Sequence, residues 1–342
     1  MNFLLVGSLR HRIKAAALIF VVAVLAGLLP SCNNSEYHRP PPKVVDGVID
    51  LRHWDFEKSG PVKLDGAWRF RWHRFFRPGA SDDNGGGASE NHGFITVPGP
   101  WNATVRRLTG EDNQLPETGF ATYGLTILLP PEDRILALRT EAIFASGEIF
   151  INGRLIFSQG NPGTSREDSV GRIRPGVAGF HSGGGKTELR VNASNFHWRI
   201  GGIIDPIHIG LPHQIQTIRD RNLNFEVFSF GILLFMSLYH LLLFAIRPSD
   251  KSPLFFALFC LEVCLRVVVK GERLVLHVLP FLDDHFFGAA EYLTLPMGVL
   301  YFGLFLRSVF PEDMFRRIWY LLMGISVCLC LHAVSGDVLT VS

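Results

Sequence analysis

The chain has 342 residues, of which 47% are hydrophobic and 19% are charged, and its formal net charge is +2. Without a basic tract, this balance gives no reason to expect a nucleic-acid partner. The two halves differ: residues 33–222 carry 22 Lys and Arg against 21 Asp and Glu, whereas residues 223–342 carry only 8 against 10 between long apolar runs. This distribution excludes a purely soluble protein, and the many Phe, Leu, Ile and Val residues exclude a disordered one.

The amino terminus has the pattern of a secretory signal peptide. Three basic residues precede the uncharged apolar stretch 15–30, and a small residue and Cys32 follow. The ending Leu-Pro-Ser-Cys resembles a lipoprotein signal, in which Cys32 becomes the lipidated first residue. The alternative is an uncleaved signal anchor in which this cysteine has no role. Under either interpretation residues 1–32 are a signal, and the residues that follow leave the cytoplasm.

Residues 33–222 contain many short strand-like runs and no convincing amphipathic helix. Turn signals separate the runs, and Asn152-Gly153 between 149–151 and 155–157 is typical of a two-residue hairpin. This pattern predicts an all-β domain, a jelly roll or β-sandwich, outside the cytoplasm.

Residues 223–342 predict an α-helical transmembrane bundle. A spanning helix needs about 20 mostly apolar residues, because a rise of 1.5 Å per residue must cover about 30 Å. Four apolar runs meet or approach this length. They lie near 227–246, 253–269, 286–306 and 318–335.

Charge asymmetry predicts the orientation of these spans. If residues 33–222 are outside, the inside loops 247–252 and 307–317 carry five basic residues, whereas the outside loop 270–285 has two basic and three acidic ones. The signal at the amino terminus and these loop charges together predict that the β domain lies outside the cytoplasm.

Two ionisable residues lie within the second predicted span. Glu262 and Arg266 are four residues apart, so they share a helix face and can pair there. We expect this intramembrane pair to hold the bundle together or to relay a signal, and not to be catalytic.

Six short motifs in the β segment follow the order of a known domain. They are Leu-Asp-Gly-Ala-Trp-Arg-Phe at 64–70, Val-Pro-Gly-Pro-Trp-Asn at 97–102, Gly-Phe-Ala-Thr-Tyr at 119–123, Ile-Asn-Gly-Arg at 151–154, Val-Asn-Ala-Ser-Asn at 191–195 and Gly-Gly-Ile-Ile at 201–204. The series resembles the amino-terminal sugar-binding jelly roll of the β-galactosidase family of glycosidases, which has a galactose-binding-like fold.

The membrane segment carries a second resemblance. Tyr-His-Leu-Leu-Leu-Phe at 239–244, Arg247 and Leu-Phe-Phe-Ala-Leu at 254–258 resemble the start of the membrane unit of bacterial seven-transmembrane receptors with diverse intracellular signalling. In that family an extracytoplasmic domain senses a ligand and a cytoplasmic enzyme responds. This chain shows four spans instead of seven and ends at Ser342 without an effector, so we expect a fragment or a truncated gene product.

Catalysis by the chain itself is not expected. Glycoside hydrolysis needs two carboxylates on a rigid scaffold, which a separate barrel supplies in the glycosidases that the domain resembles. Here the membrane segment follows the β domain directly. The histidines show no metal-ligand spacing, and Ser-Gly-Gly-Gly-Lys-Thr at 182–187 lacks the first glycine and the following helix of a phosphate loop. No cofactor or metal is predicted.

A sugar site needs aromatic faces for the ring and amide or guanidinium groups for the hydroxyls. Two turn-rich segments, 101–102 and 195–199, combine these groups and are the expected sugar site. The alternative is a structural role, in which they close the edge of the sandwich. The candidate ligand-binding residues are Trp101, Asn102, Asn195, His197, Trp198 and Arg199.

Two functions from different classes follow from these observations. The first is a membrane receptor whose periplasmic jelly roll binds a carbohydrate or another small ligand and passes the signal to the bundle. The second is a membrane-anchored module that binds a glycan or a protein without signalling. The expected partners are therefore the ligand and the membrane, and a homodimer is left open.

Overall fold

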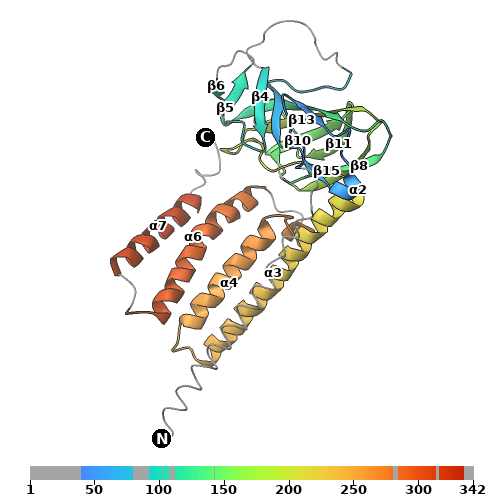
Figure 1. Cartoon of the computed structure of the whole chain (residues 1–342). Helices are drawn as coiled ribbons and strands as arrows, with labels where there is room; N and C mark the ends of the chain where they lie inside the picture. Colours follow the sequence, from blue (N-terminus) through green and yellow to red (C-terminus); the bar gives the residue numbers. More distant parts are fainter. Residues whose placement is uncertain are drawn as a thin grey trace. The chain divides into compact units, whose positions relative to one another are not determined.

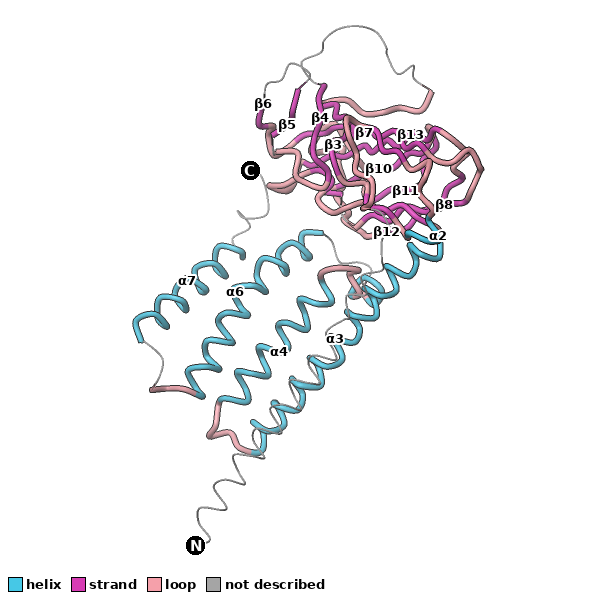
Figure 2. Tube along the Cα trace, viewed as in Figure 1, coloured by secondary structure: helices cyan, strands magenta, loops and turns pink. Residues whose placement is uncertain are grey.

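The computed structural model describes residues 40–79, 92–102, 104–107, 112–141, 143–279, 284–312 and 316–334. Strands precede Pro212 and long helices follow it, as the tube coloured by secondary structure shows (Figure 2). The signal expected at 1–32, with Cys32, lies outside the described residues.

The larger sheet runs in the order β11-β10-β13-β7-β3-β4-β5-β6, and β1 pairs with β7 in parallel. Its strands are β1 Val48–Asp50, β3 Gly66–Trp72, β4 His92–Val97, β5 Thr104–Arg107, β6 Asp112–Gln114, β7 Gly119–Leu128, β10 Ser146–Ile151, β11 Arg154–Gln159 and β13 Lys186–Asn195. The long central pair of β7 with β13 is antiparallel.

A second sheet runs in the order β12-β8-β15-β2, and β14 pairs with β9. These strands are β2 Val62–Lys63, β8 Ile135–Thr140, β9 Ile143–Phe144, β12 Gly176–His181, β14 Gly202–Ile203 and β15 His208–Gly210. The short helix α2 (Phe56–Ser59) begins after Asp55, whose carboxylate accepts hydrogen bonds from the backbone N–H groups of the first turn.

One hydrophobic core joins the two sheets, which makes the domain a β-sandwich. Trp68 and Tyr123 from the large sheet and Leu138 and Ile209 from the second belong to the same buried cluster, each at most 1% exposed. Burying one such side chain contributes roughly 1.5–3 kcal/mol. The all-β fold expected from the sequence is therefore confirmed.

The hairpin expected at Asn152-Gly153 forms between β10 and β11. Both residues have positive φ, 48° and 81°. A two-residue turn of this kind matches the twist of the strands it joins, which is why Asn-Gly predicted it.

Four long helices follow the β domain, with the four-residue α5 (Val275–Val278) between the second and third. They are α3 Pro212–Ile246, α4 Ser252–Val269, α6 Asp284–Val309 and α7 Arg316–Val334. Three of them are long and apolar enough to cross a membrane, whereas the apolar stretch of α7, Trp319–His332, is shorter. Three of the four expected spans are thus supported by length and composition.

The long helices lie side by side in chain order, α3 against α4, α4 against α6 and α6 against α7 (Figure 1). Large apolar side chains remain exposed along them, such as Phe235 on α3, Leu295 on α6 and Leu331 on α7. Exposure of this kind suits a lipid environment and would be unfavourable in water.

Candidate functional site

The outer face of the large sheet gathers basic side chains. Alternation along β3 buries Phe70 and Trp72 in the core and turns Arg69 and Arg71 to the opposite face. The strand register places Arg69 beside Gly124 of β7 and Gly124 beside Arg190 of β13. Two arginines that are far apart in the sequence therefore face each other across a glycine.

Gly124 creates the space for this arrangement. A Cβ atom at this position would lie 2.7 Å from Arg190 Nη1 and 3.6 Å from Arg69 Cβ. Because glycine has no Cβ, the guanidinium group of Arg190 can lie over the backbone of β7.

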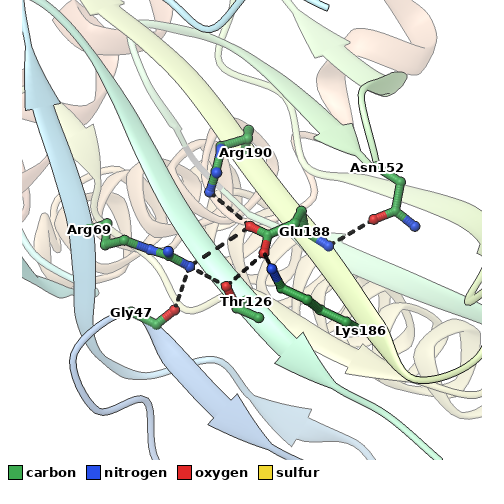
Figure 3. Close-up of polar contacts among 7 residues, drawn as sticks. All are labelled: Gly47, Arg69, Thr126, Asn152, Lys186, Glu188 and Arg190. Carbon is green, nitrogen blue, oxygen red and sulfur yellow. Dashed lines mark hydrogen bonds and ion pairs between the residues drawn. The ribbon is translucent and has the colours of Figure 1, made fainter. Parts of the chain in front are cut away.

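Glu188 of β13 organises these cations, and Figure 3 shows its contacts. Its carboxylate accepts a hydrogen bond from the Thr126 hydroxyl at 2.9 Å and forms ion pairs with Arg190 at 3.1 Å and Lys186 at 2.9 Å. Arg69 Nη2 also donates to Thr126 and to the Gly47 carbonyl, and lies 3.8 Å from the carboxylate. Burial alone would raise the pKa of Glu188, but these partners hold that pKa below 4.5.

The segment after β3 forms a wall over this face. The backbone N–H of Phe76 donates to Thr122 Oγ1 and Asn192 Oδ1, both at 2.9 Å, and Asn192 Nδ2 donates to the Phe76 carbonyl at 3.0 Å. The Thr122 hydroxyl donates to the carbonyl of Arg74 at 2.7 Å. Thr122 and Asn192 are buried, so their hydrogen bonds fix the wall to the sheet.

The sheet face and this wall border a half-open cavity of about 410 Å³, which we name the arginine pocket. Its lining includes the five arginines Arg69, Arg71, Arg74, Arg77 and Arg190. Aromatic rings add apolar surface and come from Phe75, Phe76 and Phe120. No carboxylate belongs to the described lining. Such a site can bind a small polar molecule by hydrogen bonds and charge.

The arginine pocket is not among the sites expected from the sequence. The signal was present in the run Arg-Phe-Arg-Trp-His-Arg-Phe-Phe-Arg at 69–77, which interleaves basic and aromatic residues. Period-two alternation predicts Arg69 and Arg71 on one face, but only the strand register shows that Arg190 lies opposite them.

The candidate residues Trp101 and Asn195 are fully buried. The Trp101 ring packs edge-on against Trp72 at 5.2 Å, and its indole N–H donates to the Glu117 carbonyl at 3.2 Å. Asn195 holds the turn that follows it: its Nδ2 donates to the Ile200 carbonyl at 3.2 Å, and its Oδ1 accepts from the backbone N–H of Trp198 at 2.9 Å. These contacts are structural, and a ligand role for either residue stays a prediction.

The other four candidates lie on or near this turn. Asn102 Nδ2 donates to the Arg199 carbonyl at 3.4 Å, and His197 Nε2 lies 3.2 Å from the Ser169 carbonyl. Trp198, 7% exposed, and Arg199 line a second cavity of about 270 Å³. Arg266 of α4 lines the same cavity, so the structure brings two separately predicted sites together.

Within α4, Glu262 and Arg266 lie one turn apart, as expected. The guanidinium of Arg266 donates to α6, with Nη1 2.9 Å from the Glu291 carbonyl and 2.8 Å from Thr294 Oγ1. Glu262 is 7% exposed, and its Oε1 atom is buried without a hydrogen-bond partner. The contacts of Arg266 tie α4 to α6, and a signalling role for the pair stays a prediction.

A buried ion pair connects the β domain to the loop after α4. Arg139 of β8 pairs with Glu141 and with Glu272, and the side chains of Arg139 and Glu272 are only 2% and 7% exposed. Arg219 Nε of α3 lies 3.9 Å from Glu272, and the backbone N–H of Glu272 donates to Glu226 at 3.0 Å. One loop residue thus has polar contacts with both the sheet and the first long helix.

Among the described residues, no group of three or more His, Cys, Asp or Glu side chains could hold a metal ion. Likewise, no Asp or Glu belongs to the described lining of the arginine pocket, so carboxylate-dependent metal binding there has no basis in these residues.

Comparison with solved structures finds partial matches to glycosidases. A Faecalibacterium prausnitzii β-glucuronidase is 15% identical, with a TM-score of 0.30 over 44% of this chain and 31% of that one. A Ruminococcus gnavus β-glucuronidase is 19% identical, with a TM-score of 0.31 over 44% and 30%. A Bacteroides vulgatus β-glycosidase is 14% identical, with a TM-score of 0.29 over 44% and 20%. This chain therefore spans less than a third of each of these proteins.

No curated protein matches the chain. A protein-family model does match its carboxyl-terminal part, over residues 222–341, which include α3, α4, α6 and α7. The model is described as 7TM diverse intracellular signalling. The resemblance noted at 239–258 is thereby confirmed: residues 222–341 match the model of the 7TM diverse intracellular signalling family.

Proposed function

We propose that the chain is the sensing part of a receptor in a bacterial inner membrane. Its β domain lies in the periplasm, binds a carbohydrate-like ligand, and passes the binding event to the helices. One observation carries the proposal: a β domain with a half-open polar and aromatic pocket continues directly into a membrane segment that matches the model of a signalling family.

The arginine pocket supports the proposal of ligand binding because rigid elements form its floor and its wall. Its floor is made by three hydrogen-bonded strands, and its wall is fixed by the buried Thr122 and Asn192. A volume of about 410 Å³ lies within the range of small-molecule sites. Phenylalanine rings beside hydrogen-bond donors are the combination that sugar rings require.

The ion pair of Arg139 with Glu272 supports transmission to the membrane. Separating these two buried charges is costly, so a movement of β8 should carry the loop that contains Glu272 with it. That loop directly follows α4, and Glu226 of α3 holds its backbone. Ligand binding can shift the helices only if the ligand prefers one of their arrangements, which is what the experiment must test.

The test uses the full chain in lipid nanodiscs. Binding is measured on a glycan array with wild type, Trp198→Ala and Arg190→Gln, which separate the second cavity from the arginine pocket. Arg154→Gln is the control, because Arg154 is exposed on β11 outside both cavities. Saturable binding that one cavity variant loses and the control keeps supports the proposal and identifies the site. No binding on a broad array contradicts it.

Signalling needs a separate measurement. A spin label is attached to a cysteine at position 251, between α3 and α4, in a chain whose native cysteines are replaced by serine. A change in label mobility when the bound ligand is added supports a receptor. Binding without any such change favours the alternative, a membrane-anchored binding module.

The orientation is tested by fusing alkaline phosphatase, which is active only outside the cytoplasm, after residues 250, 273 and 312. We expect activity only for the fusion after residue 273. Activity after 250 and 312 but not after 273 would overturn the periplasmic placement.

A further inference from the structure

Cationic groups converge on the arginine pocket from three separate parts of the chain. Arg69 and Arg71 come from β3, Arg74 and Arg77 from the wall, and Arg190 from β13. Each guanidinium is charged at any physiological pH and offers five N–H donors in a fixed planar geometry. The arginine pocket therefore presents positive charge and hydrogen-bond donors on both its floor and its wall.

The fold leaves space for a guanidinium group at the floor of the arginine pocket. The missing Cβ of Gly124 leaves the space that Arg190 Nη1 occupies, and Glu188 holds Arg190 from the other side at 3.1 Å. A guanidinium fixed in this way loses little freedom when it binds a ligand. Five arginines and no carboxylate belong to the described lining of the cavity, so its charge favours an anionic occupant over a neutral or cationic one.

Size and aromatic content limit what the anion can be. A half-open cavity of about 410 Å³ suits a molecule of one or two sugar rings. The rings of Phe75 and Phe120 pack together at 4.9 Å beside the cations and supply apolar surface. A bare inorganic anion would leave that surface unused, whereas the C–H groups of a sugar ring would cover it.

We infer that the arginine pocket binds an acidic sugar, a pyranose that carries a carboxylate, sulfate or phosphate group. Arg69 and Arg190 bind the anionic group at the floor, beside Gly124, and the phenylalanines contact the ring. Arg74 and Arg77 contact the ligand from the wall. This inference deepens the proposed function, on which it rests, by naming the ligand class.

The experiment is calorimetric titration of the full chain in nanodiscs with acidic sugars and their neutral counterparts. The acidic probes are D-glucuronate, N-acetylneuraminate, galactose 6-sulfate and glucose 6-phosphate. The neutral probes are glucose and galactose, and inorganic phosphate and sulfate test the anion alone. We expect at least one acidic sugar to bind roughly tenfold or more tightly than its neutral counterpart, because hydrogen bonds between charged groups are the stronger class. Its affinity should fall as salt is raised.

Two variants change the pocket in different ways. The double variant Arg74→Gln and Arg77→Gln removes two exposed charges of the wall, and Arg154→Gln on β11 is the matched control. Gly124→Ala keeps the charge but forces Arg190 Nη1 to move from the position that the new Cβ would approach to 2.7 Å. Its control is Gly179→Ala on β12, where the nearest atom to a new Cβ is 3.9 Å away. We expect both pocket variants to weaken binding roughly tenfold and both controls to leave it unchanged.

The outcomes separate this inference from the proposed function. If neutral sugars bind as tightly as acidic ones, the acidic-sugar assignment is overturned and the carbohydrate sensor stands. If inorganic phosphate or sulfate binds as tightly as every acidic sugar, the sugar part of the assignment is overturned. If acidic sugars bind and both pocket variants bind like wild type, the site is elsewhere and the inference fails. If neither class of sugar binds, both proposals fall.

Discussion

Arg69 of β3 and Glu188 of β13 meet across β7, with 3.8 Å between Arg69 Nη2 and Glu188 Oε2 and with the Thr126 hydroxyl bonded to both side chains. The contact crosses three strands that lie far apart in the sequence. It therefore fixes the floor of the arginine pocket in addition to the backbone hydrogen bonds of the sheet. We expect this network to contribute to the free energy of unfolding and to make that free energy depend on pH.

The first prediction concerns Glu188→Gln. The amide keeps the size of the side chain but removes the charge that Arg69, Lys186 and Arg190 contact, so we expect a loss of about 1–3 kcal/mol in the free energy of unfolding. Five of the six tryptophans precede Pro212, so tryptophan fluorescence during thermal unfolding of the full chain in nanodiscs reports mainly on the β domain. Glu148→Gln, on the neighbouring strand β10, is the control and should change the melting temperature little. Equal melting temperatures for Glu188→Gln and wild type would contradict a stabilising role.

The second prediction is the pH dependence of the same network. Because the pKa of Glu188 is below its ordinary value of 4.5 in the folded protein, the unfolded chain takes up the proton first as the pH falls. The stability that this carboxylate contributes is present above about pH 4.5 and is lost as the pH falls through the pKa of the folded state. As the pH falls from about 5 to 3, the melting temperature of wild type should therefore decrease more steeply than that of Glu188→Gln. Parallel curves for the two proteins would show that another group controls this range.

The third prediction tests the structural role of Trp101. A Cβ at Gly201 would lie 2.4 Å from Trp101 Cζ2 and 2.9 Å from Asn195 Cβ, so Gly201→Ala must displace a buried ring. We expect a cost of about 1–3 kcal/mol, as for other overpacked cores. Gly179→Ala, which meets only one atom at 3.9 Å, is the control. The same fluorescence melts measure both variants, and a Gly201→Ala protein as stable as the control would show that this ring can move freely.

Much of the fold could be predicted because its signals are local. Asn152-Gly153 forms a hairpin from its own backbone preferences, and the apolar runs at 227–246 and 253–269 lie within helices for reasons of length and composition. Local signals do not specify the arginine pocket, although residues 69–77 interleave basic and aromatic side chains. Arg71 and Asn192 both lie beside Thr122 only because β3 and β13 pair with opposite edges of β7, and one sequence does not specify that register.

The same difference between local signals and long-range contacts explains why burial of the candidate sugar-site residues was not predicted. Trp101 and Trp198 were chosen for their turn-rich surroundings and polar neighbours, which are local properties. Their burial depends on distant partners: the ring of Trp101 packs against Trp72, and Trp198 forms a buried cluster with Ala145. The sequence does not show these partners, so the burial of the two rings could not be predicted from it, and their role in ligand binding stays a prediction.

The last prediction concerns the link between the β domain and the membrane helices. In Glu272→Gln the buried guanidinium of Arg139 keeps Glu141 as its one charged partner within the described part of the chain. The contacts of the loop with β8 and Arg219 weaken as a result. Removing one partner of a buried ion pair is costly, so we expect a loss of about 3 kcal/mol. The matched control is Glu291→Gln, which removes the pair with Lys270 at 2.9 Å. That pair is exposed, 58% for Lys270 and 43% for Glu291, and should contribute less than about 1 kcal/mol.

Limited trypsin digestion of the full chain in nanodiscs distinguishes the two variants, because Lys270 and Arg273 flank Glu272 in the same loop. Release of this loop in Glu272→Gln should speed cleavage there, since proteolysis follows local opening. Cleavage after Arg273 in Glu291→Gln should stay close to that of wild type, whereas Lys270 loses its ion-pair partner in this variant and is not compared. If both variants are cleaved at the wild-type rate, Glu272 does not hold the loop, and the proposed route from β8 to the helices loses its support. If only Glu272→Gln is cleaved faster, the buried pair is the contact through which movement of the β domain can reach α4.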